Sequence, residues 1–186
     1  MPGSKEKWNA KYGAKSSFSK EPDPFLVEHV HLFKPGSVLD FACGTGRNAL
    51  WLAKKGYTVD GADISEVGLD LLETEAKANQ LTVRTMVIDL TDQEQLNDLQ
   101  TYDNLIINLY KPSPKVLLEL PKHLNKGGIL LICTHNWHQV AAGKFKKQYS
   151  LGPNELMDLN WQMKLVQHAS FENNSGFYDG YVFEKL

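Results

Sequence analysis

Cysteine is scarce in this sequence of 186 residues, and so are long apolar runs and an excess of charge of one sign. The two cysteines, Cys43 and Cys133, lie far apart and in different predicted elements. Neither their number nor their spacing fits a disulfide framework or a zinc site. We therefore expect two reduced thiols in a cytoplasmic protein.

The charges are balanced, because 20 lysine and arginine residues stand against 22 aspartate and glutamate residues, for a net charge of −2. This balance argues against a dedicated nucleic-acid surface. No apolar run approaches the length of a membrane span, and residues 1–18 are polar and lysine-rich. We expect binding neither to nucleic acid nor to a membrane, and the sequence indicates no oligomeric state.

Apolar segments that resemble strands alternate with helical patterns as far as Thr134, which predicts an open parallel sheet with right-handed crossovers. Beyond Thr134 we expect partly helical segments at 135–148 and 154–159. Two consecutive strands joined by a turn should follow, at 163–170 and 177–185. The strands expected in the first part cover 37–40, 57–62, 82–88, 103–109 and 129–133, and the helices 5–13, 24–33, 47–55, 66–79, 92–99 and 114–124.

The stretch Ser37–Asn48 carries the clearest motif, an apolar strand, a loop of small residues and a helical pattern from Arg47. Gly44 and Gly46 allow positive φ and a close approach of a ligand to the backbone. The helix that follows offers unpaired N–H groups and the positive end of its dipole. The candidate ligand contacts in this stretch are Asp40, Phe41, Ala42, Gly44, Gly46 and Asn48.

The ligand is not identified by the glycines alone, because the residues from Gly44 to Ala49 also fit the dinucleotide pattern G-x-G-x-x-A. Asp40, four residues before Gly44, would place a negative charge near a diphosphate. The same acid suits a ligand with an ammonium group and hydroxyls, as in S-adenosylmethionine. An NAD-dependent oxidoreductase remains the less favoured alternative.

Further polar residues stand where other predicted strands end, and open α/β sheets bind ligands at that edge. Asp63 follows Gly44 by 19 residues and could accept two hydrogen bonds from ribose hydroxyls, or could be an ordinary loop acid. Asp89 could face the adenine amine, or could serve helix entry. Asn108 and His135 occupy equivalent positions. His135 and His138 lack a third ligand, so we expect no metal site.

Trp8 and Tyr12, four residues apart in a predicted helix, have two open interpretations. They could be core aromatics that cover the end of the sheet. They could instead form a lid whose rings lie against the sulfonium of the cofactor.

The sequence resembles the class I S-adenosylmethionine-dependent methyltransferases, and most closely their small tellurite-resistance-type group, relatives of thiopurine methyltransferase. The resemblance rests on Trp8–Gly13 and on Val38–Leu69, which includes the acid before the G-x-G turn. It implies the class I methyltransferase fold, a Rossmann-like open, mostly parallel sheet with helices on both faces and a C-terminal antiparallel hairpin. It also implies cofactor contacts from Trp8, Tyr12, Asp40, Gly44, Gly46, Asp63, Ile64, Asp89 and Leu90, with Asn108 beside the transferring methyl.

The expected protein is one domain, 1–186, with an N-terminal lid and first helix at 1–36, a cofactor-binding core at 37–134 and an acceptor-side segment with the hairpin at 135–186. It would move the methyl group of S-adenosylmethionine to a small molecule such as a thiol or metalloid oxyanion, leaving S-adenosylhomocysteine. Tyr110, Lys111 and His135 are candidates for the acceptor side. A catalytically silent cofactor-binding sensor or partner protein stays open as an alternative.

Overall fold

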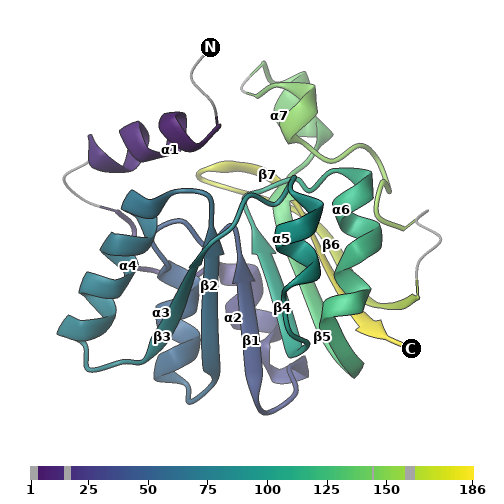
Figure 1. Ribbon diagram of the computed structural model, residues 1–186. Coiled ribbons are helices and arrows are strands. Elements are labelled where there is room, and N and C mark those ends of the chain that lie inside the picture. The colour runs from purple at the N-terminus through teal and green to yellow at the C-terminus, as the bar shows by residue number, and fades with distance from the viewer. Residues whose placement is uncertain (1–3, 15–17, 144, 158–161) are drawn as a thin grey trace.

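A seven-stranded sheet forms the centre of the computed structural model, which describes residues 4–14, 18–143, 145–157 and 162–186 (Figure 1). The strand order is β3-β2-β1-β4-β5-β7-β6. The first five strands pair in parallel, whereas β7 runs antiparallel to both β5 and β6. The strands are β1 (Ser37–Phe41), β2 (Thr58–Asp63), β3 (Val83–Val87), β4 (Tyr102–Asn108), β5 (Leu124–His135), β6 (Met163–Asn173) and β7 (Gly176–Lys185). The predicted parallel sheet with its C-terminal hairpin is confirmed.

The helices lie on both faces of the sheet and above its upper edge (Figure 1). Five of them pack on the faces, with α2 (Pro24–His29), α3 (Arg47–Lys54) and α4 (Glu66–Ala78) on one side and α5 (Gln93–Asn97) and α6 (Pro114–Glu119) on the other. The remaining two, α1 (Ser4–Gly13) and α7 (Trp137–Ala141), lie beyond the carboxyl ends of the strands. Among the residues that the structure describes, no helix has the length and apolar character needed to cross a membrane.

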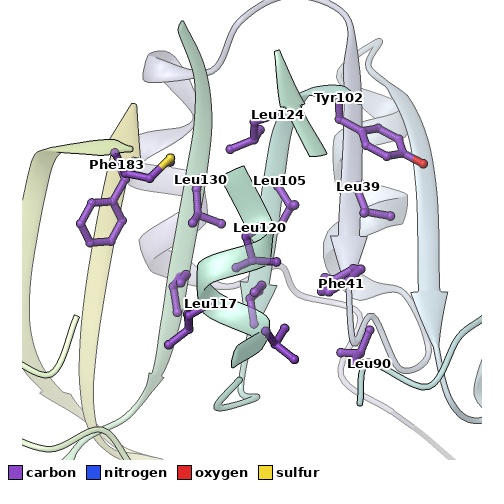
Figure 2. Packing of buried hydrophobic residues seen from close by; sticks show 14 of the residues in the cluster. Leu39, Phe41, Leu90, Tyr102, Leu105, Leu117, Leu120, Leu124, Leu130 and Phe183 are labelled. Atoms are coloured by element: carbon purple, nitrogen blue, oxygen red, sulfur yellow. The ribbon is translucent and has the colours of Figure 1, made fainter. Parts of the chain in front are cut away.

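The central strand β4 is apolar on both faces because helices cover both of them. Leu105 and Ile107 point into the core under α5 and α6, where Figure 2 shows Leu105 beside Leu130, its partner on β5. Ile106 points the other way, into the core under α2, α3 and α4. The continuous apolar run of the sequence is therefore explained by burial on two sides.

Helix starts follow local side-chain chemistry, as the sequence predicts. Asp23 accepts hydrogen bonds from the amides of Phe25 and Leu26, with Pro24 at the first position of α2. Ser65 accepts a hydrogen bond from the Gly68 amide and caps α4. The first cap also accepts a hydrogen bond from Asn108 at the end of β4, and the second follows directly on β2.

Several predicted elements differ from the structure, and the strand expected at 129–133 extends over Leu124–His135. The helix expected at 24–33 ends at His29 and continues as a 3-10 turn, and the one expected at 114–124 turns into a 3-10 helix at Leu120, where Pro121 has no N–H to donate. The prediction of a helix at 154–159 is wrong for residues 154–157, where the chain forms a turn and Asn154 has a φ of 56°. Residues 158 and 159 lie outside the described residues.

A polar cluster joins strands β2, β3 and β4. The carboxylate of Asp60 on β2 accepts a hydrogen bond from the Tyr102 hydroxyl at 2.7 Å and pairs with Arg84 of β3. Burial and this carboxylate raise the pKa of Tyr102 to about 12, so its hydroxyl remains a donor. These contacts therefore provide hydrogen-bond donors for the carboxylate of Asp60, which is buried in the sheet.

Replacing Tyr102 by Phe should lower the free energy of unfolding by about 1–2 kcal/mol, because a buried carboxylate loses one of its donors. Chemical denaturation would measure the change. Tyr149→Phe is the matched control, since Tyr149 is exposed. A Tyr102→Phe variant as stable as that control would contradict the role given to this hydrogen bond.

Candidate functional site

A cavity of about 390 Å³ lies at the carboxyl ends of the parallel strands, below α1. Its walls come from α1, from the loop between β1 and α3, and from the segments that follow β2, β3, β4 and β5. It brings together most of the predicted contacts, namely Trp8, Tyr12, Asp40, Ala42, Gly44, Asn48, Asp63, Ile64, Asp89, Leu90 and Asn108.

Phe41 and Gly46 are exceptions to that prediction, because neither lines the cavity. Phe41 is fully buried in the core below α6. Gly46 has φ 77°, and a Cβ at this position would overlap the side chain of Leu72 on α4. Gly46 is therefore needed for close packing of the loop on α4, which differs from the predicted ligand contact.

Gly44 has the role expected of a residue without a side chain at a site of close approach. Its φ is 57°, and a Cβ would lie 2.6 Å from the Tyr12 hydroxyl. The tyrosine of α1 thus reaches directly onto the loop. Ala42, just before it, also has a positive φ of 59°, a backbone strain of the kind that collects at functional sites.

Asp63 is buried and connects the loop to the next helix. Its Oδ2 accepts a hydrogen bond from the Gly44 amide at 2.8 Å, and its Oδ1 accepts one from the Ser65 amide at the same distance. Burial raises the pKa of this carboxyl, while the backbone donors act in the opposite direction. The structure shows the loop contacts of Asp63, and the contact with ribose hydroxyls stays a prediction, for which each oxygen keeps a second lone pair.

Asp40 carries a buried carboxylate oxygen without a partner within the part of the chain that the structure describes. The residue is 1% exposed, and its Oδ2 is buried without a hydrogen-bond partner among the described residues. Burial raises its pKa from 3.8 to about 7, against the lowering effects of the Ala49 backbone and of Arg47. An acid in this state would be stabilised by a cationic group or a hydrogen-bond donor of a ligand.

Arg47 lines the cavity, although the sequence identified it only as the start of a helix. Its Nη2 donates a hydrogen bond to Asn108 Oδ1 at 2.6 Å and lies 3.5 Å from Asp23 Oδ2. Asn108 in turn donates to Asp23 at 2.8 Å. The amide of Asn108 thus positions a guanidinium. The sequence did contain a signal for this role, because Arg47 is the first residue of the helix that follows the glycine loop.

The helix α1 is held over the cavity by α4. Asn9 accepts a hydrogen bond from the Ser65 hydroxyl at 2.6 Å, and Lys5 pairs with Glu66 at 2.6 Å. The rings of Trp8 and Tyr12 stack with centroids 5.7 Å apart and face the cavity. Burial and the nearby Asp63 raise the pKa of Tyr12, so its hydroxyl stays protonated.

Asp89, after β3, lines the cavity and also organises its own loop, because it accepts hydrogen bonds from the amide and hydroxyl of Thr91. The three residues predicted for the acceptor side differ in whether they line the cavity. Tyr110 and His135 line the cavity, but Lys111 does not. Lys111 instead pairs with Glu155 at 2.7 Å and donates a hydrogen bond to the Ser150 carbonyl, which corrects its predicted place.

Cysteine and histidine build no evident metal centre. Cys43 and Cys133 are buried and not joined in a disulfide. Within the described ranges, no group of three or more histidine, cysteine, aspartate or glutamate side chains is placed to hold a metal ion.

Replacing Asp40 by Asn should stabilise the protein above pH 7 and have little effect near pH 4. The folded-state pKa of Asp40 is raised, so its stability contribution is complete at low pH and is lost as pH rises through about 7. An amide can still accept from the Ala49 backbone and carries no charge. A gain of about 2–4 kcal/mol at pH 8 follows from a shift of this size.

Urea denaturation of the wild type and of Asp40→Asn at the two pH values would measure this. Asp70→Asn, on the exposed face of α4, is the control. Equal stability of the Asp40→Asn variant and the wild type at pH 8 would show that this acid carries no burial cost.

Comparison with known proteins supports one family. The family described as tellurite resistance protein TehB matches residues 4–169. A probable S-adenosyl-L-methionine-dependent methyltransferase TehB from Haemophilus influenzae (strain 10810) is 27% identical over 113 residues, which cover 58% of this chain and 38% of that protein. A 23S rRNA (uracil(747)-C(5))-methyltransferase from Pyrococcus abyssi (strain GE5 / Orsay) is 33% identical over 106 residues, which cover 56% of this chain and 24% of that protein.

The chain thus spans less than half the length of these relatives. The crystal structure of TehB from Haemophilus influenzae has a TM-score of 0.72 at 18% identity, covering 98% of this chain and 67% of the other, and so shares the fold. Because the family match extends over most of the sequence and agrees with the resemblance found in its motifs, the chain belongs to the TehB family.

Proposed function

We propose that this protein is a methyltransferase that transfers the methyl group of S-adenosylmethionine to a small molecule. The unpartnered Oδ2 of Asp40 carries the proposal, because Asp40 lines the cavity together with Gly44 and the second acid Asp63. Buried carboxylates favour a ligand with an ammonium group and hydroxyls and disfavour a diphosphate. The name of the TehB relative from Haemophilus influenzae supports the same cofactor.

The residues of the cavity fit the groups of this cofactor. Asp40 would hold the ammonium group, and Arg47 the carboxylate, as a fixed cation. Asp63 would accept from the ribose hydroxyls, and Asp89 with Leu90 would border the adenine. Trp8 and Tyr12 present aromatic faces, which suit the cationic sulfonium.

When bound, S-adenosylmethionine supplies a methyl group on a good leaving group. The protein would contribute orientation. An acceptor held in line with the methyl group lowers the activation free energy of methyl transfer, by about 7 kcal/mol or more in favourable cases. Leu109, Tyr110 and His135 border the acceptor side. A small acceptor, such as a thiol or metalloid oxyanion, is favoured by the cover that α1 forms over the cavity and by the balanced charge of the chain.

Isothermal titration should detect micromolar binding of S-adenosylmethionine and S-adenosylhomocysteine, and no binding of NAD. Asp63→Asn should weaken binding about tenfold or more, since a charge-assisted hydrogen bond contributes roughly 1.5–3 kcal/mol. Asp70→Asn should bind as the wild type does. Binding of NAD alone would support the oxidoreductase alternative. Binding of neither ligand would refute the proposal.

The affinity for S-adenosylmethionine should rise with pH up to about 7 and then level off. The reason is that the ammonium group pairs only with ionised Asp40, whose pKa is raised to about 7 without ligand. Binding at pH 6 should therefore release a proton. Titrations in two buffers of different ionisation enthalpy measure that release, which should vanish in Asp40→Asn. An affinity that is flat from pH 5 to pH 8 would argue against this pairing.

A further inference from the structure

His135, the last residue of β5, is the one histidine in the described parts of the chain that lines the cavity. Its Nδ1 is buried and has no hydrogen-bond partner among the described residues. The side chain as a whole is half-buried, and Nε2 is not among the buried atoms that lack a partner. We therefore take Nε2 as the nitrogen that faces the cavity.

The ring of His135 is held in place by two aromatic neighbours. It stacks on Tyr178 of β7 with centroids 4.7 Å apart, and Phe145 covers it with centroids 4.5 Å apart. Its backbone is also fixed, because its carbonyl accepts a hydrogen bond from the Leu151 amide at 2.8 Å. A ring confined in this way can meet a ligand without much loss of side-chain entropy.

The surroundings favour the neutral form of this imidazole. Burial lowers the pKa of His135, and the backbone of Phe177 acts weakly against it as the second cause. Tyr178 of β7 stacks on it, Tyr110 lines the same cavity, and burial raises the pKa of both phenols. The charged residues that line the cavity belong to other elements, namely Lys11 to α1, Arg47 to α3, and Asp40, Asp63 and Asp89 to β1, β2 and the segment after β3.

We propose that His135 is the proton acceptor for the methyl acceptor, and that the substrate therefore carries a proton on its nucleophilic atom, as a thiol or a hydroxyl does. The inference rests on the proposed methyltransferase function. As the new bond forms between that atom and the methyl carbon, the carbon–sulfur bond of the sulfonium breaks and its electron pair stays on sulfur. The proton of the acceptor moves to Nε2 of His135, and water later takes it from the imidazolium.

This assignment narrows the class of substrate. An acceptor that arrives already deprotonated, such as an oxyanion or an acidic thiolate, gains nothing from a base. A thiol or hydroxyl that keeps its proton near pH 7 depends on one. Tyr110 and Phe145 line the same cavity as His135 and favour an acceptor with an apolar or aromatic body.

Two one-ring thiols test the assignment with S-adenosylmethionine near pH 7. Phenylmethanethiol is mostly protonated there, whereas 4-nitrobenzenethiol is ionised. His135→Gln should lower kcat for phenylmethanethiol about 100-fold and that for 4-nitrobenzenethiol less than about threefold. His138→Gln is the matched control, because His138 is exposed on α7 and does not line the cavity. It should leave both rates unchanged.

A second readout does not depend on turnover. The Cε1–H resonance of His135, assigned from its absence in His135→Gln, should titrate below the usual imidazole range and shift when phenylmethanethiol is added with S-adenosylhomocysteine. Equal losses for the two thiols in His135→Gln, or a titration at or above the usual range, would overturn the assignment.

Calorimetry separates this inference from the proposed function. His135→Gln should bind S-adenosylmethionine as the wild type does, within about twofold, so loss of turnover with intact binding concerns His135 alone. A wild-type protein that binds no S-adenosylmethionine would refute the proposed function. If neither thiol is methylated by a protein that binds the cofactor, the resonance of His135 decides.

Discussion

The burial of two carboxylates at one edge of the sheet is the constraint on which the cavity depends. Asp40 and Asp63 are both buried, but only in Asp63 does each carboxylate oxygen accept a hydrogen bond from a backbone amide. Asp40 retains an oxygen without a partner, and its raised pKa reflects that cost. A ligand that places a cation beside Asp40 would therefore also stabilise the folded protein when it binds.

The same edge connects the parts that surround the cavity. Asp63 bonds the glycine loop through Gly44 and the start of α4 through Ser65, and the hydroxyl of Ser65 bonds Asn9 of α1. A continuous series of hydrogen bonds thus runs from the loop to the helix that covers it. Because Tyr12 contacts Gly44 directly, the position of α1 and the shape of the loop depend on each other.

The two sides of the cavity differ in chemistry. Acids, an arginine and backbone amides collect around β1 and β2, while His135, Tyr110 and Phe145 form an apolar and aromatic border near β4 and β5. Such a division suits a reaction between a charged methyl donor and a less polar acceptor. Under the proposed function, the acids would contact the cofactor and the aromatic side would contact the acceptor.

Much of the fold could be predicted because its signals are local. Capping residues such as Asp23 and Ser65, the apolar run of β4 and the glycines of the loop each act on their own neighbours in the chain. The turn at 154–157 could not be predicted in this way. Asn154 there adopts a left-handed backbone conformation, and Glu155 accepts hydrogen bonds from Lys111 and from the Gly152 amide.

The sequence by itself determined the order of strands and helices and the acids that end the strands, since period and spacing are properties of the chain. Only the tertiary structure decided which of these side chains meet. In the folded protein, Phe41 and Gly46 contribute to packing, and Lys111 forms an ion pair with Glu155. Arg47 lies beside Asn108 and Asp23. The physical reason is that burial and partners far apart in sequence, which fix a side chain's direction and proton affinity, exist only once the sheet has formed.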